Sequence, residues 1–132
     1  WKPPYSRITA IDMNTGEHAW MIPTGETPAR VANNPALQGI DIGNTGTGNL
    51  VPMVVTKNML VYSDTATDGT PMLYAINKAS GNIEAEIEVP ARSRYGMSSW
   101  VHEGRQFIML QTGSSLTAMA LPSDEEVGGR AH

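Results

Sequence analysis

A glycine-rich segment near the middle of the chain is the first candidate for chemistry. It reads Gly43-Asn44-Thr45-Gly46-Thr47-Gly48-Asn49. Such loops bind phosphate through backbone N–H groups, but a P-loop needs Lys and then Ser or Thr where this chain has Asn49 and Leu50. The dinucleotide pattern G-x-G-x-x-G fails too, because Val51 replaces its third glycine. Neither nucleotide-binding pattern is met.

The other polar residues show no recognisable catalytic set. A metal site needs convergent ligands, and His18 and His102 are isolated, one on a predicted strand and one at a predicted hairpin. The acidic run at 124–126 follows Pro122 and precedes two glycines, so we interpret it as a solvated tail. Neither a Ser-His-Asp nor a paired-carboxylate signature is present.

The composition excludes several classes of protein. Nine Lys and Arg against 13 Asp and Glu give a formal charge of -4, and no two basic residues are adjacent. Phosphate binding needs clustered basic side chains, so we expect no nucleic-acid partner. The absence of cysteine excludes disulfides and thiolate chemistry. The chain opens at Trp1 without Met, which leads us to expect a processed or truncated protein.

Turn residues and short alternating segments indicate an all-β chain. Thirteen Gly and nine Pro separate stretches in which apolar side chains recur with period two. The stretch from Thr24 to Asn49 contains no such pattern. The predicted strands are Arg7–Met13, His18–Ile22, Val51–Thr56, Met59–Ser63, Met72–Asn77, Ile83–Val89, Gly96–Val101, Phe107–Thr112 and Leu116–Leu121.

An internal repeat decides between the all-β architectures. Residues 8–16 (ITAIDMNTG) align with residues 73–81 (LYAINKASG), and residues 116–121 (LTAMAL) are a shortened third copy. The second and third copies are one four-stranded propeller blade apart, and the first interval is a blade with an insertion. Two and a fraction such units cannot close a ring. We therefore expect consecutive antiparallel four-stranded blades of a larger β-propeller.

The first copy of the repeat belongs to a longer motif. Residues 10–20 fit A-x-D-x-x-T-G-x-x-x-W at Ala10, Asp12, Thr15, Gly16 and Trp20. This pattern resembles the tryptophan-docking motif of the eight-bladed quinoprotein dehydrogenases, which use pyrroloquinoline quinone. In that family the indole stacks against the adjoining blade, where its large apolar area is buried and its N–H finds a partner. The resemblance makes Asp12 a turn residue rather than a catalytic base.

Further segments resemble the C-terminal end of these enzymes. Pro52–Lys57 is similar to the strand that opens the last blade, Gly104–Ile108 to its hairpin, and Ala118–Pro122 to its ending. Glu26–Gly39 resembles an inter-blade insertion of the membrane-bound glucose and polyol dehydrogenase branch. We expect the end of one blade at 1–23, an insertion at 24–50, a full blade at 51–90, an incomplete last blade at 91–122 and a tail at 123–132.

Three departures from the family pattern concern docking and the cofactor. The second repeat has Asn77, Ser80 and Ala85 in place of Asp, Thr and Trp, which predicts weak docking or none. A glycine pair usual before the last blade is Leu50-Val51 here. A Gly- and His-rich loop is reduced to residues 111–115.

The resemblance implies a dehydrogenase that oxidises a hydroxyl group of a sugar, polyol or alcohol with pyrroloquinoline quinone and Ca²⁺. A carboxylate base would remove the hydroxyl proton as hydride passes to a quinone carbon polarised by the metal. In the family the segment before the last blade approaches the quinone, so Gly48, Asn49 and Leu50 are the predicted cofactor contacts. Earlier blades hold the base and the Ca²⁺ ligands, so we expect no catalytic or metal residue here and no activity from the chain alone.

The resemblance also implies partners and a location. The parent enzyme would work in the periplasm with a small-molecule substrate and a quinone electron acceptor, attached to the inner membrane through an N-terminal region. The remaining blades are expected partners, and unpaired blade edges favour self-association of the isolated chain.

Two alternatives are compatible with part of the pattern. A non-catalytic propeller scaffold for protein–protein interaction could share the repeats but would not need the insertion. A self-contained β-sandwich with a carbohydrate- or protein-binding surface has a suitable length but does not explain the five-position motif.

Overall fold

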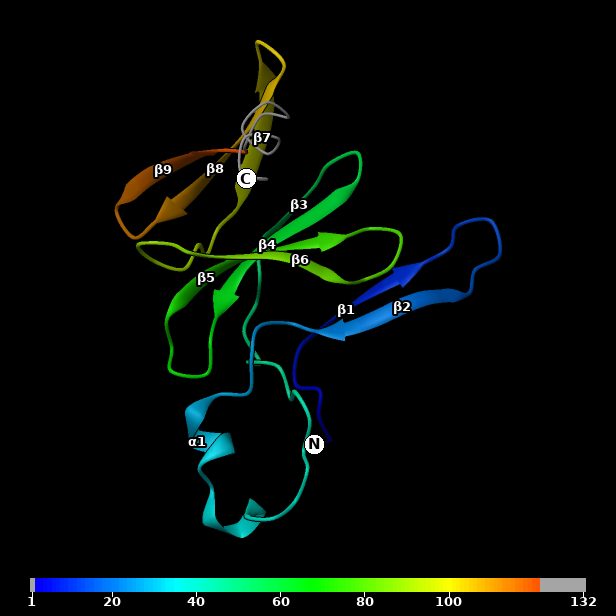
Figure 1. Ribbon diagram of the computed structural model, residues 1–132, viewed down its shortest axis with the longest axis vertical. Helices are drawn as coiled ribbons and strands as arrows, with labels where there is room; N and C mark the ends of the chain where they lie inside the picture. The colour runs from blue at the N-terminus through cyan, green and yellow to red at the C-terminus, as the bar shows by residue number, and fades with distance from the viewer. Residues whose placement is uncertain (1, 122–132) are drawn as a thin grey trace, which may run out of the picture.

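Apolar segments that alternate with turn residues become nine strands in the computed structural model, which describes residues 2–121. They form three antiparallel sheets that follow one another along the chain (Figure 1). The first sheet contains β1 (Arg7–Ile11) and β2 (His18–Pro23). The second has the order β3-β4-β5-β6, and the third has the order β7-β8-β9. The remaining bounds are Met53–Val55 for β3, Met59–Thr65 for β4, Pro71–Asn77 for β5, Ile83–Glu88 for β6, Met97–His102 for β7, Arg105–Thr112 for β8 and Ser115–Ala120 for β9.

The all-β prediction is confirmed, and each predicted strand is present with ends that differ by two residues at most. β1 is two residues shorter than predicted and ends at Ile11, because Asp12 begins the turn. Its carboxylate accepts the N–H of Asn14 at 2.8 Å, and its carbonyl accepts the N–H of Gly16 at 2.7 Å. A residue whose groups close a turn cannot continue the strand ladder.

The segment between the first two sheets contains no strand. It has one turn of helix, α1 (Ala29–Ala32), and a single 3-10 turn, η1 (Pro35–Leu37), neither of which was predicted. In Figure 1 this segment forms a lobe that extends away from the sheets. The predicted tail at 123–132 lies outside the described residues. None of the helices within residues 2–121 is long and apolar enough to cross a membrane.

The internal repeat has the same backbone geometry in its first two copies. Ala10 pairs with Trp20 across β1 and β2, and Ala75 pairs with Ala85 across β5 and β6. In both hairpins the register shifts immediately after the alanine. The side chain of Asn77 accepts a backbone N–H two residues on, as Asp12 does. β1 therefore corresponds to the third strand of a blade, so the first sheet consists of a third and a fourth strand.

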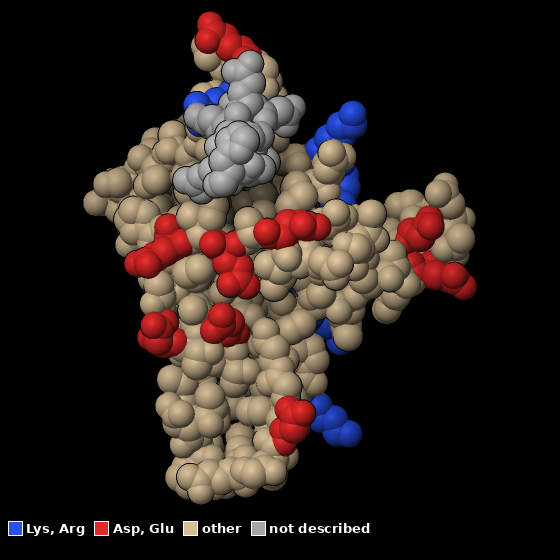
Figure 2. Space-filling model, in the orientation of Figure 1, with Lys and Arg blue, Asp and Glu red and all other residues tan. Residues whose placement is uncertain are grey.

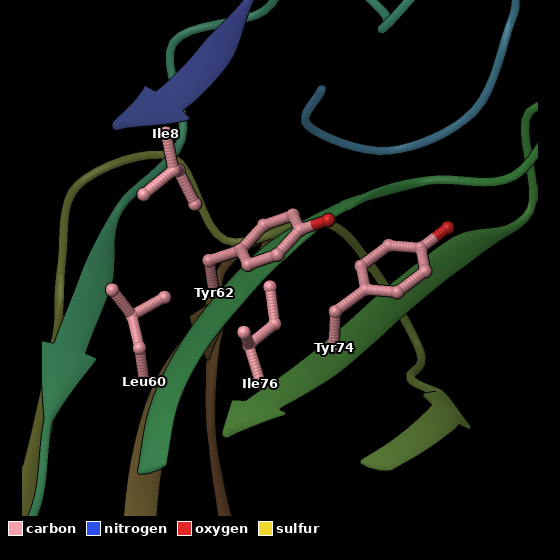
Figure 3. Packing of buried hydrophobic residues seen from close by; sticks show 5 residues of the cluster. All are labelled: Ile8, Leu60, Tyr62, Tyr74 and Ile76. Carbon is pink, nitrogen blue, oxygen red and sulfur yellow. The ribbon is translucent and has the colours of Figure 1, made fainter. Parts of the chain in front are cut away.

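The middle sheet buries both of its faces. On one face Leu60, Tyr62, Tyr74 and Ile76 pack with Ile8 of β1 (Figure 3). On the other face Val61 and Leu73 pack with Val89 and with Ile108 and Leu110 of β8. Fully burying a large apolar side chain contributes about 1.5–3 kcal/mol, so these two clusters are the main force that holds the sheets together.

The three sheets are arranged as successive wedges rather than as two stacked layers. Each neighbouring pair shares one cluster, and β3 contacts β7, the first strand of the next sheet. This is the arrangement of propeller blades that follow one another around an axis. The described sheets have two, four and three strands, so the chain is part of a propeller.

Two stacked tyrosines form the centre of the first cluster. The rings of Tyr62 and Tyr74 are 5.0 Å apart and 18° from parallel. Burial raises the pKa of Tyr62 to about 12. The hydrogen bond from the Gly25 N–H acts in the opposite direction but is the smaller effect. Burial also raises the pKa of Tyr74. Both hydroxyls therefore stay protonated in the folded chain at a pH where a free tyrosine ionises.

The raised pKa predicts a loss of stability at alkaline pH. The unfolded chain releases the tyrosine proton above pH 10.0 while the folded chain retains it until about pH 12. The free energy of unfolding should therefore fall through this window, by up to about 1.4 kcal/mol per pH unit for each buried tyrosine. Urea unfolding between pH 9 and pH 12 tests this. Tyr62→Phe should flatten the decline, and Tyr95→Phe, which removes an exposed hydroxyl, is the matched control.

Candidate functional site

The predicted cofactor segment lies where the three sheets meet. The chain returns from the lobe at residues 45–47, which are buried, and then runs through Gly48, Asn49 and Leu50 toward β3. Gly48 and Leu50 are exposed and Asn49 is half-buried. We call residues 48–50 the joint, because each of them bonds to a different part of the molecule.

The three bonds of the joint connect successive sheets. The N–H of Gly48 donates to Ser6 Oγ, directly before β1, at 2.9 Å. Asn49 Nδ2 donates to Asp64 Oδ1 on β4 at 2.8 Å. The carbonyl of Leu50 accepts from Arg92 Nη1, on the link to the third sheet, at 3.0 Å. The backbone of the joint is therefore held from three sides.

Asp64 is the buried centre of this network. Its side chain has no solvent exposure, and its two carboxylate oxygens accept three hydrogen bonds. Thr47 Oγ1 donates to Oδ2 at 2.7 Å, whereas Asn49 Nδ2 and the Thr65 N–H donate to Oδ1. A buried carboxylate is stable only when such donors replace water. Asp64 therefore requires residues 47 and 49 to stay in place.

Gly25 lets the beginning of the lobe pass directly over this carboxylate. A Cβ at Gly25 would lie 2.9 Å from Asp64 Cγ and 2.6 Å from Thr47 Cγ2. Its N–H donates to the Tyr62 hydroxyl at 3.1 Å. Both ends of the lobe are therefore attached to β4, and the last residues of the lobe lead directly into the joint.

Several polar groups of the joint remain available to a ligand. Among the described residues, the N–H of Leu50, the carbonyl of Asn49 and Asn49 Oδ1 have no hydrogen-bond partner. The side chain of Leu50 is 91% exposed. The joint can thus offer a backbone donor and backbone or side-chain acceptors to a flat polar molecule.

A hollow of about 370 Å³ lies next to the third sheet, and Arg92 connects it to the joint. Of the described residues, Arg92, Arg94, Tyr95 and Gln111 are part of its lining, and none of the lining residues within 2–121 is acidic. Within residues 2–121, Arg94 makes no hydrogen bond or ion pair. Guanidinium groups bind carboxylates with two parallel hydrogen bonds, so this hollow is suited to an anionic group.

The face shown in Figure 2 does not suit such a ligand. Acidic side chains spread across the face shown in Figure 2, and Lys and Arg lie mostly at its margins. Among the described residues, no group of three or more His, Cys, Asp or Glu could hold a metal ion. His102 lies 3.9 Å from Glu103 at an exposed hairpin.

Trp20 contacts the second sheet. Its Nε1–H donates to the carbonyl of Lys78 at 2.8 Å, in the turn between β5 and β6. The indole covers Gly81, where a Cβ would lie 2.8 Å from Trp20 Cδ2. The turn residues Asp12, Thr15 and Gly16 set the direction of β2, since Thr15 Oγ1 accepts the N–H of Glu17 and Gly16 has φ +76°. Ala10 is the strand partner of Trp20.

Sequence reasoning missed Asp64 and Arg92. Asp64 follows Ser63 near the end of β4 and has no motif around it, and the side chains that bond to it belong to residues 15 and 17 positions earlier in the chain. Its only sequence signal is an acidic residue at the end of a strand that is apolar on both faces. Arg92 has no signal of this kind.

Similar proteins agree with the family expectation. The profile of the family described as "PQQ: Glucose/ethanol/alcohol dehydrogenase, beta-propeller domain" matches residues 1–108. The glycerol dehydrogenase large subunits of Gluconobacter thailandicus and Gluconobacter oxydans are each 30% identical over 130 residues, or 96% of this chain. The chain spans 17% of the length of these relatives. No solved structure is significantly similar to it.

A paired glycine substitution tests the contact of Trp20. Gly81→Ala and Gly16→Ala both place a side chain at a positive φ, +78° and +76°, but only the first also meets the indole. We expect Gly81→Ala to cost about 1–3 kcal/mol more than Gly16→Ala, the usual cost of overpacking. Urea unfolding followed by tryptophan fluorescence measures both. Equal costs would show that Trp20 does not contribute to holding the sheets together.

An isosteric substitution tests the buried network. Thr47→Val removes the hydroxyl that serves Asp64 Oδ2 and should cost about 1–3 kcal/mol, the penalty of a buried polar atom without a partner. Thr9→Val on β1 is the control, because the Thr9 hydroxyl has no hydrogen bond among the described residues. The control should stay within about 0.5 kcal/mol of the parent sequence. A Thr47→Val variant as stable as the control would contradict the network.

Proposed function

Because the chain belongs to the family of glucose, ethanol and alcohol dehydrogenase β-propeller domains, we propose that it supplies the last blades of a dehydrogenase that uses pyrroloquinoline quinone. The family match over residues 1–108 carries this proposal. The parent enzyme oxidises hydroxyl groups of polyols, sugars or alcohols. Polyols are favoured, since both relatives are named glycerol dehydrogenase.

The chain serves the parent enzyme first as part of the ring. Among the described residues the middle sheet has four strands, whereas the first has two and the third has three. Each blade of the complete ring would have four strands. In this scheme Trp20 docks the first blade onto the second, as its contact with Gly81 and Lys78 supports. Its strand partner Ala10 and the turn residues Asp12, Thr15 and Gly16 position it. The second repeat, which has Ala85 in place of Trp, docks without an indole.

The joint is the part of this chain that we assign to the cofactor. Pyrroloquinoline quinone is flat and carries carbonyl and carboxylate groups around its edge. The Leu50 N–H suits such an acceptor, and the Arg92–Arg94 hollow suits a carboxylate. Gly48 has no side chain, so the backbone can come close to the ring. These residues fit the edge of the quinone.

The chemistry divides between the cofactor and the protein. When bound, the quinone accepts the electrons that the substrate loses. The residues of this chain bind and orient it, and the joint fixes its edge. The catalytic base and the Ca²⁺ ligands come from earlier blades. The parent enzyme lies in the periplasm, is attached to the inner membrane and passes electrons to a quinone acceptor.

Reconstitution of the parent protein tests this proposal. The full reading frame is expressed, purified without cofactor and supplied with pyrroloquinoline quinone and Ca²⁺. An artificial electron acceptor then reports turnover with glycerol, glucose and ethanol. We expect turnover with at least one of these, and removal of Ca²⁺ by a chelator should abolish it.

The same assay on the isolated 132 residues should show no turnover. A parent protein that binds the quinone but oxidises no alcohol, polyol or sugar would favour the non-catalytic scaffold. Turnover by the isolated chain would contradict the assignment of the catalytic residues to earlier blades.

A further inference from the structure

Asp64 is the one fully buried carboxylate among the described residues, and the proposed function gives it no task. Its bonds go mainly to the return of the lobe, at residues 47 and 49, and its own strand contributes only the Thr65 N–H. Packing of β4 does not require a carboxylate at this position, because Asp64 pairs with the apolar Met72 across the sheet and shares a strand face with the buried Tyr62. A buried charge costs several kcal/mol unless it is fully bonded, so its placement calls for a reason.

The bond to Asn49 determines what the joint presents. Because Asn49 Nδ2 points inward to Asp64, the amide oxygen of Asn49 has no partner within residues 2–121, and its backbone carbonyl has none there either. Thr47 supports the same arrangement, since its hydroxyl bonds to Asp64 and also accepts the N–H of Asn49 at 3.1 Å. The conformation of the joint is thus coupled to one carboxylate beneath it.

We propose that Asp64 is a positioning residue for the quinone: by holding Asn49 from below, it fixes the backbone of residues 48–50 in the conformation that receives the cofactor. This inference rests on the proposed function. Asp64 does not touch the cofactor, and its effect passes through Asn49. Preorganisation of this kind improves affinity because the loop is ordered before the ligand binds.

Asparagine is the informative replacement. Asp64→Asn keeps the size and shape of the side chain, which the contact with Gly25 requires. It removes the negative charge and turns one of the two acceptor oxygens into an NH2 donor, so the bond from Asn49 Nδ2 changes from a charge-assisted bond to a weaker neutral one. Asp68→Asn is the matched control: Asp68 is exposed in the turn after β4, where it accepts hydrogen bonds from Thr70, and it has no contact with the joint.

The experiment uses the full parent protein without cofactor. Pyrroloquinoline quinone is titrated and its dissociation constant is read from the quenching of tryptophan fluorescence; thermal unfolding is measured in parallel. We expect Asp64→Asn and Asn49→Ala each to raise the dissociation constant about tenfold, as loss of one hydrogen bond to a charged group would do. Asp68→Asn should change it less than about twofold.

The double variant separates positioning from general destabilisation. If Asp64 acts through Asn49, Asp64→Asn combined with Asn49→Ala should weaken binding no more than either change alone. Gly81→Ala, which disturbs the Trp20 contact and not the joint, should lower the melting temperature with a much smaller effect on the dissociation constant. Should Asp64→Asn fail to fold, Asn49→Ala and Gly81→Ala still provide this comparison.

Two results would overturn the inference while leaving the proposed function intact. One is unchanged quinone affinity in both Asp64→Asn and Asn49→Ala. The other is a double variant whose losses multiply, which would make the two residues independent. A parent protein that does not bind the quinone at all would overturn the proposed function, and the inference with it.

Discussion

The structure depends on a sheet that is apolar on both faces. Five consecutive residues of β4, Leu60 to Asp64, are buried, which is possible only when something covers each side of the sheet. In a two-layer sandwich one face of each sheet meets solvent, so apolar and polar side chains alternate along its strands. Here the first sheet covers one face of the middle sheet and the third sheet covers the other. The three sheets therefore follow one another as wedges.

The joint follows from the same constraint. Links between neighbouring blades cross where the blades are closest, and there the lobe returns to the middle sheet. The polar groups of this return cannot all reach water, so they bond to Asp64, Ser6 and Arg92. A loop held in this way keeps one conformation, and the groups it leaves unbonded are presented in a constant direction.

The two boundaries between sheets are built differently. Between the first and second sheets, the indole of Trp20 covers Gly81 and bonds to Lys78. Between the second and third, the N–H of Ser93 donates to the buried Ser63 Oγ, and apolar residues of β8 fill the space. Replacement of Trp by Ala85 in the second repeat is accommodated because that boundary depends on the apolar cluster.

The nine strands, the repeat and the turn at Asp12 could be predicted from the sequence because they depend on residues close together in the chain. Period-two alternation, turn residues and a five-position motif are local signals, and the family resemblance followed from them. Tertiary structure alone decided the partners of the joint. Asp64 and Asn49 are 15 residues apart, and Arg92 and Leu50 are 42 apart, without any pattern that connects them. Such contacts form only after burial of both faces of the middle sheet has brought the three sheets together. Local sequence cannot specify which polar groups will then form hydrogen bonds with one another.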